Sequence, residues 1–292
     1  MTPRPDFEPG PPPGPSHGTA APAGRQRPRV PLPEVDVVSS ATESGGRPAL
    51  TVRPATGTVR GTVLHLHGGG YRMGSPAGGE PLSAHLSART RTEVVSPAYR
   101  LAPRHPFPAA VDDALAGYRE LLERGVAPER LVLLGGSAGG GLAVAVLLAA
   151  REAGLPRPAA AVCLSPWFDL TVTADSYDRC AARDPMLGRA VLRESAEAYL
   201  AGADPRDPLA SPLFADEAAL AWLPPLLVQV GEGEVLVDDA TRFAARVVQA
   251  GGSCLVERWP DATHGWQLFV RESAAAVEAA DAVARFIDAR LP

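Results

Sequence analysis

One stretch of sequence decides the fold: Leu131-Val132-Leu133-Leu134-Gly135-Gly136-Ser137-Ala138-Gly139-Gly140. Its four apolar residues predict a buried strand, and the Ala-, Leu- and Val-rich residues 140–153 predict a helix directly after it. A Gly-x-Ser-x-Gly pattern at a strand-to-helix junction is typical of a nucleophile elbow, a strained turn that lifts a serine hydroxyl above the sheet. We therefore expect Ser137 to be a nucleophile. The alternatives are a plain glycine-rich turn and a phosphate cradle, which the lack of a following Lys disfavours.

A second glycine-rich loop, His67-Gly68-Gly69-Gly70, follows the apolar run Val63-Leu64-His65-Leu66. Consecutive glycines let a backbone approach a ligand closely and present successive N–H groups to it. Such a loop forms half of an oxyanion hole in hydrolases that use the elbow. We expect the donors to be the N–H groups of Gly68, Gly69 and Ala138. A flexible loop tip is the alternative interpretation.

A serine nucleophile needs a base, and His264 is the only one of six histidines that follows Ser137. It lies in a loop between the last predicted strand and the last predicted helix. The chain order serine, acid, histidine is the order of this hydrolase architecture. His65 and His67 form an H-x-H pair, but no third ligand stands nearby in the sequence, so we expect no metal site.

The acid that orients the histidine should follow a strand between Ser137 and His264. Residues 226–230 predict that strand, and three carboxylates come after it, Glu232, Glu234 and Asp238. Asp238 is explained as the N-cap of the next helix. We choose Glu234 and keep Glu232 as the second candidate, since the local pattern does not separate them.

The rest of the chain predicts an α/β protein with a mostly parallel central sheet and helices on both faces. The first three strands lie close together with no helix between them, so we expect the sheet to begin antiparallel. Residues 1–33 hold 11 Pro and 4 Gly and predict a disordered tail, and residues 34–292 form the domain. A helical cap is expected at about residues 171–223. The predicted strands are residues 35–38, 49–53, 61–67, 93–96, 131–134, 160–164, 226–230 and 254–257, and the predicted helices are residues 108–124, 140–153, 239–250 and 273–290.

Composition excludes several other classes of protein. All 28 basic residues are Arg, which rules out a Schiff-base lysine and a Walker-type lysine. The net charge of −5 and the scattered Arg residues argue against nucleic-acid binding. The sequence offers neither a run long enough to span a membrane nor a secretory signal. Three cysteines without a CxxC pair favour reduced thiols and a cytoplasmic protein.

The sequence resembles the hormone-sensitive-lipase-like (GDXG) family of α/β-hydrolases. The resemblance runs from about residue 61 to residue 270 and rests on both glycine-rich motifs and on the segments that carry Glu234 and His264. It also includes Tyr99-Arg100-Leu101-Ala102-Pro103 and Leu164-Ser165-Pro166-Trp167. The resemblance implies that Glu234 is the triad acid. One departure is Gly136, which replaces the family's usual Asp.

The resemblance implies a serine carboxylic-ester hydrolase that works without a cofactor on short to medium acyl esters, acetyl included, of a small molecule. The alternatives are a deacetylase, an acyltransferase or an eliminating enzyme that uses the same residues. A non-catalytic small-molecule receptor and an interaction protein that uses the Pro-rich tail are further alternatives. Tyr71, Trp167 and Trp266 are the candidate pocket residues, and a homodimer is one option for the assembly.

Overall fold

The computed structural model describes residues 36–292, which form one eight-stranded sheet flanked by helices. The expectation of a disordered tail at residues 1–33 falls outside the described residues. The strands are β1 Val37–Ser44, β2 Arg47–Pro54, β3 Thr62–Leu66, β4 Glu93–Pro97, β5 Leu131–Gly136, β6 Ala160–Leu164, β7 Leu226–Gly231 and β8 Cys254–Trp259. The α-helices are α1 Glu80–Thr90, α2 Ala109–Glu123, α3 Ala138–Glu152, α4 Ser176–Arg179, α5 Arg189–Leu200, α6 Glu217–Trp222, α7 Val237–Gln249 and α8 Ala274–Asp288, with short 3₁₀ turns at Pro76–Gly79, Pro128–Arg130, Pro212–Phe214 and Trp266–Leu268.

The strands follow the order β1-β2-β4-β3-β5-β6-β7-β8 across the sheet. β1 pairs with β2 and β2 pairs with β4 in antiparallel fashion, and every later pairing is parallel. The expected antiparallel start and mostly parallel remainder are therefore confirmed. The parallel strands inside the sheet, β3, β5, β6 and β7, are almost entirely buried, which explains their apolar sequences, whereas the edge strand β8 is partly exposed.

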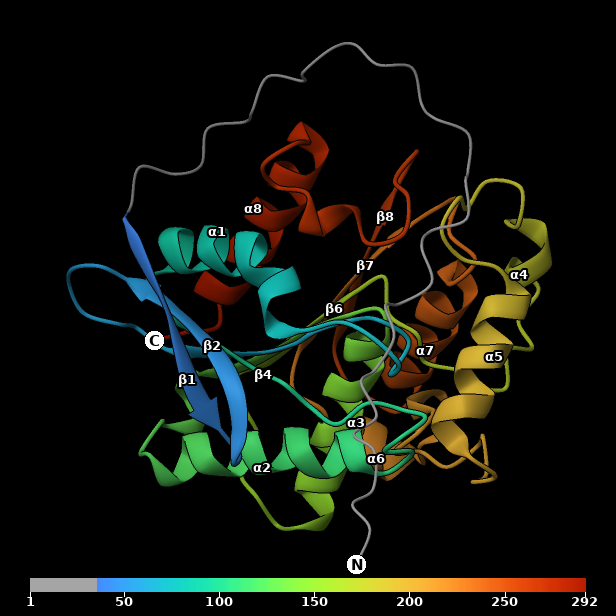
Figure 1. The fold of residues 1–292 in the computed structure, drawn as a ribbon, viewed down its shortest axis with the longest axis horizontal. Coiled ribbons are helices and arrows are strands. Elements are labelled where there is room, and N and C mark those ends of the chain that lie inside the picture. The colour runs from blue at the N-terminus through green and yellow to red at the C-terminus, as the bar shows by residue number, and fades with distance from the viewer. Residues whose placement is uncertain (1–35) are drawn as a thin grey trace, which may run out of the picture.

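Helices cover both faces of the sheet, as predicted. Alternate side chains of the strands point to opposite faces, so each face has its own core. On one face α1 and α8 pack over Val63, Val132 and Leu227. On the other face α2, α3 and α7 pack over Leu64, Leu133 and other strand residues. Figure 1 shows these two layers, with α1 and α8 above the sheet and α2 and α3 below it.

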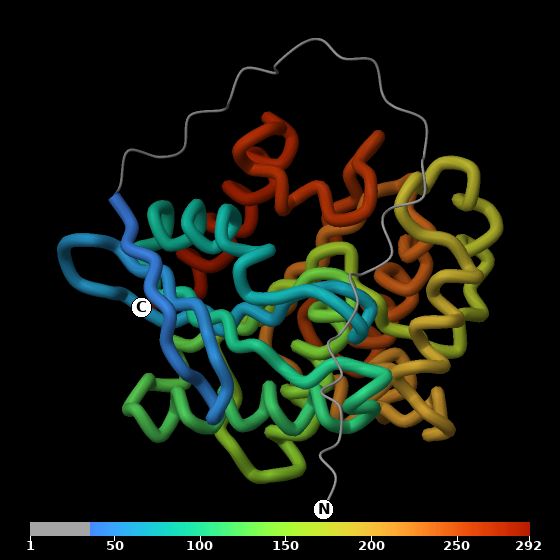
Figure 2. The backbone as a smooth tube through the Cα atoms, in the orientation of Figure 1, coloured from blue at the N-terminus to red at the C-terminus, as the bar shows by residue number. Residues whose placement is uncertain are grey.

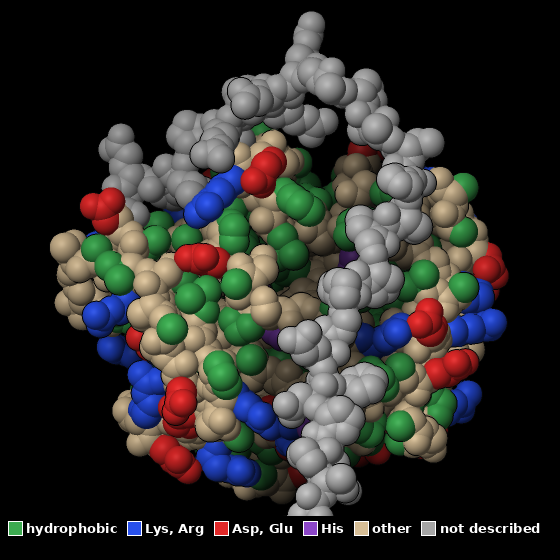
Figure 3. Space-filling view, viewed as in Figure 1, with side chains coloured by type: hydrophobic (Ala, Val, Ile, Leu, Met, Phe, Trp, Pro, Cys, Tyr) green, Lys and Arg blue, Asp and Glu red, His purple; other side chains and the backbone are tan. Residues whose placement is uncertain are grey.

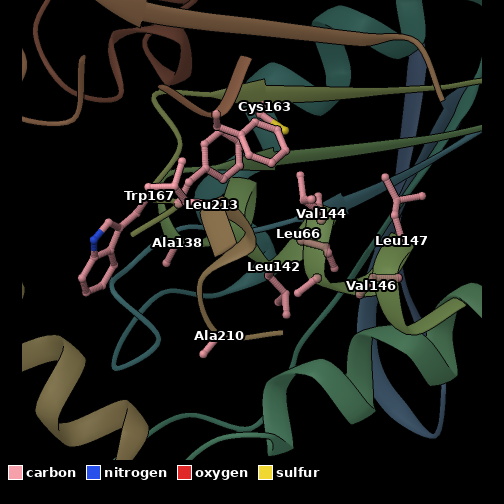
Figure 4. Packing of buried hydrophobic residues seen from close by; sticks show 14 of the residues in the cluster. Leu66, Ala138, Leu142, Val144, Val146, Leu147, Cys163, Trp167, Ala210 and Leu213 are labelled. Carbon is pink, nitrogen blue, oxygen red and sulfur yellow. The ribbon is translucent and has the colours of Figure 1, made fainter. Parts of the chain in front are cut away.

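Helix α3 is the most deeply buried helix and begins directly after Ser137. Its residues from Ala138 to Ala150 are all buried. Figure 4 shows Leu142, Val144 and Val146 of this helix packed among residues of the core that includes Leu66 and Cys163. Because both the strand before Ser137 and the helix after it are embedded in the core, the turn between them has little freedom to move.

The segment between β6 and β7 contains α4, α5 and α6 and no strand. We use the word cap for its residues 171–223. Figure 2 shows this yellow segment on the side of the molecule opposite the blue β1–β2 hairpin. The cap contacts the loops at the carboxyl ends of the parallel strands, because Tyr199 of α5 stacks on Tyr71 with ring centroids 3.8 Å apart.

Two local predictions were wrong. Helix α1 was not predicted, because its buried positions include Ser83, His85 and Ser87 and the helix shows no apolar stripe. Helix α7 was predicted to take its N-cap from Asp238 or Asp239, but its N-cap is Leu236 and both aspartates lie in the first turn. Asp238 instead pairs with Arg179 of the cap, at 2.6 Å.

Candidate active site

Ser137 occupies the predicted strained turn between β5 and α3. Its φ is +55° and its ψ is −122°, a conformation that side-chain-bearing residues rarely adopt. Its N–H donates to the carbonyl of Leu164 at 2.8 Å, and its own carbonyl accepts from the N–H of Trp167 at 3.1 Å. These hydrogen bonds to the end of β6 hold the turn in its strained form.

Ser137, His264 and Glu234 form a continuous chain of hydrogen bonds. Nε2 of His264 lies 2.9 Å from Oγ of Ser137, and Nδ1 lies 2.9 Å from Oε2 of Glu234. Ser137 comes from the β5–α3 turn, Glu234 from the β7–α7 loop and His264 from the segment after β8. The three side chains thus meet although 127 residues separate Ser137 from His264.

The carboxylate of Glu234 is fully buried, and each of its oxygens has partners. Oε2 faces His264, while Oε1 accepts from Oγ of Ser165 at 2.8 Å and from the N–H of Gly231 at 2.7 Å. The sequence reasoning did not single out Ser165 as a functional residue. It follows β6 directly with φ +46°, and its place at a strand end beside the Ser137 turn is the signal that was available.

The competing carboxylate Glu232 points elsewhere. Its side chain is 39% exposed and lies 3.4 Å from Arg258. Glu232 and Glu234 are two residues apart in the same loop, and only Glu234 reaches the histidine. The contact with His264 is therefore made by Glu234, the first choice from the sequence, and not by the second candidate, Glu232.

The glycine loop after β3 lies against the Ser137 turn. A Cβ added to Gly68 would lie 3.3 Å from Cβ of Ser137 and 2.9 Å from the carbonyl oxygen of Gly136. Within residues 36–292, the N–H groups of Gly68, Gly69 and Ala138 donate to no protein acceptor. The Ala138 N–H belongs to the first residue of α3, where helical N–H groups lack intrahelical partners. These donors are free to bind an anionic oxygen.

His67 supports this loop from within. Its Nδ1 lies 2.8 Å from the carbonyl of Gly68, and its ring stacks on Tyr99 with centroids 4.1 Å apart. The hydroxyl of Tyr99 donates to the carbonyl of His67 at 2.6 Å. Burial lowers the pKa of His67, which disfavours its charged form. His65 points the other way, to Oγ of Ser83 at 2.9 Å, so the H-x-H pair does not converge on one point.

The three candidate pocket residues are not together. Tyr71 and Trp167 share one core cluster, and their ring centroids are 6.3 Å apart. Trp266 lies in the other core cluster, where its ring is 5.8 Å from that of Trp259. We therefore retain Tyr71 and Trp167 as candidates and interpret Trp266 as a packing residue.

The face drawn in Figure 3 is hollowed near its centre, and histidine atoms are visible in and beside the hollow.

Two features are absent from residues 36–292. No group of three or more His, Cys, Asp or Glu side chains is arranged to hold a metal ion. None of the helices combines the length and the apolar character that crossing a membrane requires.

Comparison with known proteins identifies relatives of this chain. Residues 63–268 match the family described as alpha/beta hydrolase fold. An acetyl-hydrolase of Streptomyces hygroscopicus is 49% identical over 237 residues, which cover 80% of this chain and 78% of that protein. An esterase of Acinetobacter venetianus is 35% identical over 71% of this chain and 68% of its own length. A crystal structure of an esterase from the bacterial hormone-sensitive lipase family superposes with a TM-score of 0.85 at 40% identity, covering 90% of this chain and 87% of that one. The chain therefore belongs to the α/β-hydrolase fold family and, within it, to the relatives of hormone-sensitive lipase.

Proposed function

We propose that this protein is a serine carboxylic-ester hydrolase that cleaves esters of short to medium acyl groups through an acyl-enzyme. The observation that carries the proposal is the chain of two 2.9 Å contacts from Ser137 through His264 to Glu234, beside free backbone N–H groups. Relatives described as acetyl-hydrolase and esterase support the same activity.

In the proposed mechanism each group has one step, which its position supports. Nε2 of His264 takes the proton of Ser137 as Oγ attacks the acyl carbonyl, and Glu234 holds the imidazole and stabilises its charged form. The N–H groups of Gly68, Gly69 and Ala138 bind the negative oxygen of the tetrahedral intermediate, where one such donor contributes about 2.7–4 kcal/mol. His264 then protonates the leaving alcohol. Water cleaves the acyl-enzyme by the same route in reverse.

Aromatic packing near the nucleophile supports a small acyl group. The rings of Tyr71 and Tyr199 stack beside the glycine loop and are buried, and Trp167 is fully buried next to Tyr71. A Cβ on Gly141, in the first turn of α3, would lie 3.1 Å from the Tyr71 hydroxyl. Side chains therefore fill the volume beside this turn, which leaves little room there for a long acyl chain.

A homodimer and a cytoplasmic location remain predictions from the sequence.

A panel of p-nitrophenyl esters of increasing acyl length tests the activity and the acyl preference together. We expect turnover to be highest with acetyl to butyryl esters. Ser137→Ala should reduce kcat by about 10⁴-fold or more while ester binding persists. A fluorophosphonate probe should label the wild type at Ser137 and leave Ser137→Ala unlabelled.

Ser211→Ala is a matched control for this experiment. Ser211 is a fully buried serine of the cap, and its Oγ accepts a hydrogen bond from the N–H of Leu170 at 2.8 Å. It does not contact the proposed triad, so this variant should keep its labelling and most of its kcat. Near-wild-type hydrolysis by Ser137→Ala, or labelling at another residue, would contradict the proposal.

A further inference from the structure

The loop that carries Glu234 is held from two sides, and only one of them is the sheet. On the sheet side, the N–H of Glu234 donates to the carbonyl of Gly231 at 3.1 Å. On the other side, residues 176–184 of the cap contact the loop and the first turn of α7, which follows it, at several points. Among them, the N–H of Ser176 donates to Asp238 at 2.9 Å, and Arg179 makes two contacts with the same carboxylate.

Asp184 is the cap side chain that holds the peptide group directly after Glu234. Its Oδ2 accepts the N–H of Val235 at 3.0 Å, and this N–H belongs to the peptide group that joins Glu234 to Val235. Its Oδ1 accepts the N–H groups of Met186 and Leu187, each at 3.0 Å, which fixes Asp184 within the cap. The residue is only 7% exposed, so water does not replace these partners readily.

Ser176 holds the next peptide group of the same loop. Its Oγ donates to the carbonyl of Val235, and Val235 itself is fully buried. Two cap side chains therefore fix the two peptide groups that follow Glu234. A shift of either peptide group would move the Glu234 carboxylate relative to His264, because the side chain has few alternative positions in a closed core.

We propose that Asp184, a residue of the cap, is a positioning residue for the triad acid: it holds the Glu234–Val235 peptide group so that the carboxylate stays aligned with His264. This inference rests on the proposed function. It makes the cap part of the catalytic support. Asp184 acts through the backbone of Glu234 and does not touch substrate.

The environment of Asp184 makes Asp184→Asn a sharp test. The carboxylate accepts three backbone N–H groups, and none of the ion pairs within residues 36–292 involves it. An amide has the same shape but only one acceptor oxygen, so its NH₂ must face a donor. Either the Val235 contact or the turn at Met186 and Leu187 is then lost, with almost no change in side-chain volume.

The experiment measures kcat and KM for p-nitrophenyl acetate in the wild type, Asp184→Asn, Glu234→Gln and the double variant, by single-turnover kinetics for the slow forms. Asp184→Asn should lower kcat by about 10- to 100-fold with little change in KM, since misplacement of a catalytic group by about 1 Å costs up to 10²-fold. In the Glu234→Gln background the same change should alter kcat by no more than about twofold, because the group it positions is already disabled.

Two further variants separate positioning from general structure. Asp207→Asn, also in the cap, makes the same change in a carboxylate whose Oδ1 accepts the N–H of Leu209 at 2.9 Å and which does not contact the Glu234 loop. The amide keeps one acceptor oxygen for this turn, so kcat should be unchanged. Ser176→Ala removes the hydroxyl that holds the Val235 carbonyl and should lower kcat in the wild type but not in Glu234→Gln. Circular dichroism shows whether Asp184→Asn folds. If it does not fold, Ser176→Ala is the variant that tests whether the cap positions Glu234.

The inference is overturned if a folded Asp184→Asn protein keeps the wild-type kcat, or if it loses the same factor in both backgrounds. That result leaves the proposed function intact as long as Ser137 of the wild type reacts with the fluorophosphonate probe. Failure of the wild type to react with the probe or to hydrolyse any ester of the panel would instead reject the proposed function.

Discussion

At the scale of single residues, the glycines that flank Ser137 and Ala138 differ in the space around them. These are Gly136 and Gly139. A Cβ on Gly139 would collide with the carbonyl oxygens of Leu66 and His67 at the end of β3. A Cβ on Gly136 would meet only the carbonyl oxygen of Leu164, at 3.9 Å, and Gly136 has no positive φ. Only Gly139 is therefore required by the close approach of two backbones.

We predict opposite effects of the same substitution at these positions. Gly139→Ala should destabilise the protein by about 1–3 kcal/mol, since it forces the elbow away from β3. Gly136→Ala should raise the free energy of unfolding by about 0.4–1 kcal/mol, because it restricts the unfolded chain at no steric cost. Urea unfolding at pH 7 measures both. Equal losses would show that the backbone at Gly136 is also under steric constraint.

At the scale of elements, hydrogen bonds between polar side chains connect α1 to α8 on one face of the sheet. Asp281 of α8 accepts from Nε2 of His85 at 2.8 Å and from Nε of Arg89 at 2.9 Å. His85 is buried, and its Nδ1 has no partner among the described residues. Asp281 therefore provides the only hydrogen bond that the buried ring of His85 has there.

Asp281→Ala should cost about 1–3 kcal/mol of stability, since it leaves the buried Nε2 of His85 unpaired. Asp288 of the same helix is the matched control, because its pair with Arg60 at 2.9 Å is more exposed, with both side chains near 40%. Asp288→Ala should change stability by less than about 0.5 kcal/mol. Chemical denaturation of both variants decides the point, and equal costs would mean that burial of His85 does not matter.

At the scale of the whole molecule, stability depends on a histidine in the central strand β3. His65 is fully buried, and burial, with a smaller contribution from His67, lowers its pKa from 6.5 to about 4. A depressed histidine pKa means that the folded state resists protonation. The stabilisation is complete above pH 6.5, where both states are neutral, and is lost as the pH falls towards 4.

The free energy of unfolding should fall by about 2 kcal/mol between pH 7 and pH 5 through His65 alone. His65→Asn keeps a polar group opposite Ser83 and removes the titrating imidazole. Between pH 7 and pH 5 its free energy of unfolding should therefore fall by about 2 kcal/mol less than that of the wild type. Unfolding curves at a series of pH values test this, and parallel slopes for wild type and His65→Asn would refute it.

The sequence by itself determined the features that neighbouring residues encode. The elbow, the glycine loop, the core face of α8 and the parallel strands follow from local pattern, because backbone conformation and burial periodicity depend on adjacent side chains. The tertiary structure alone decided the contacts between distant segments. It placed Ser165 and Asp184 beside the acid loop and stabilised α1 without an apolar stripe. These outcomes depend on packing between residues far apart in the chain, and no local pattern records it.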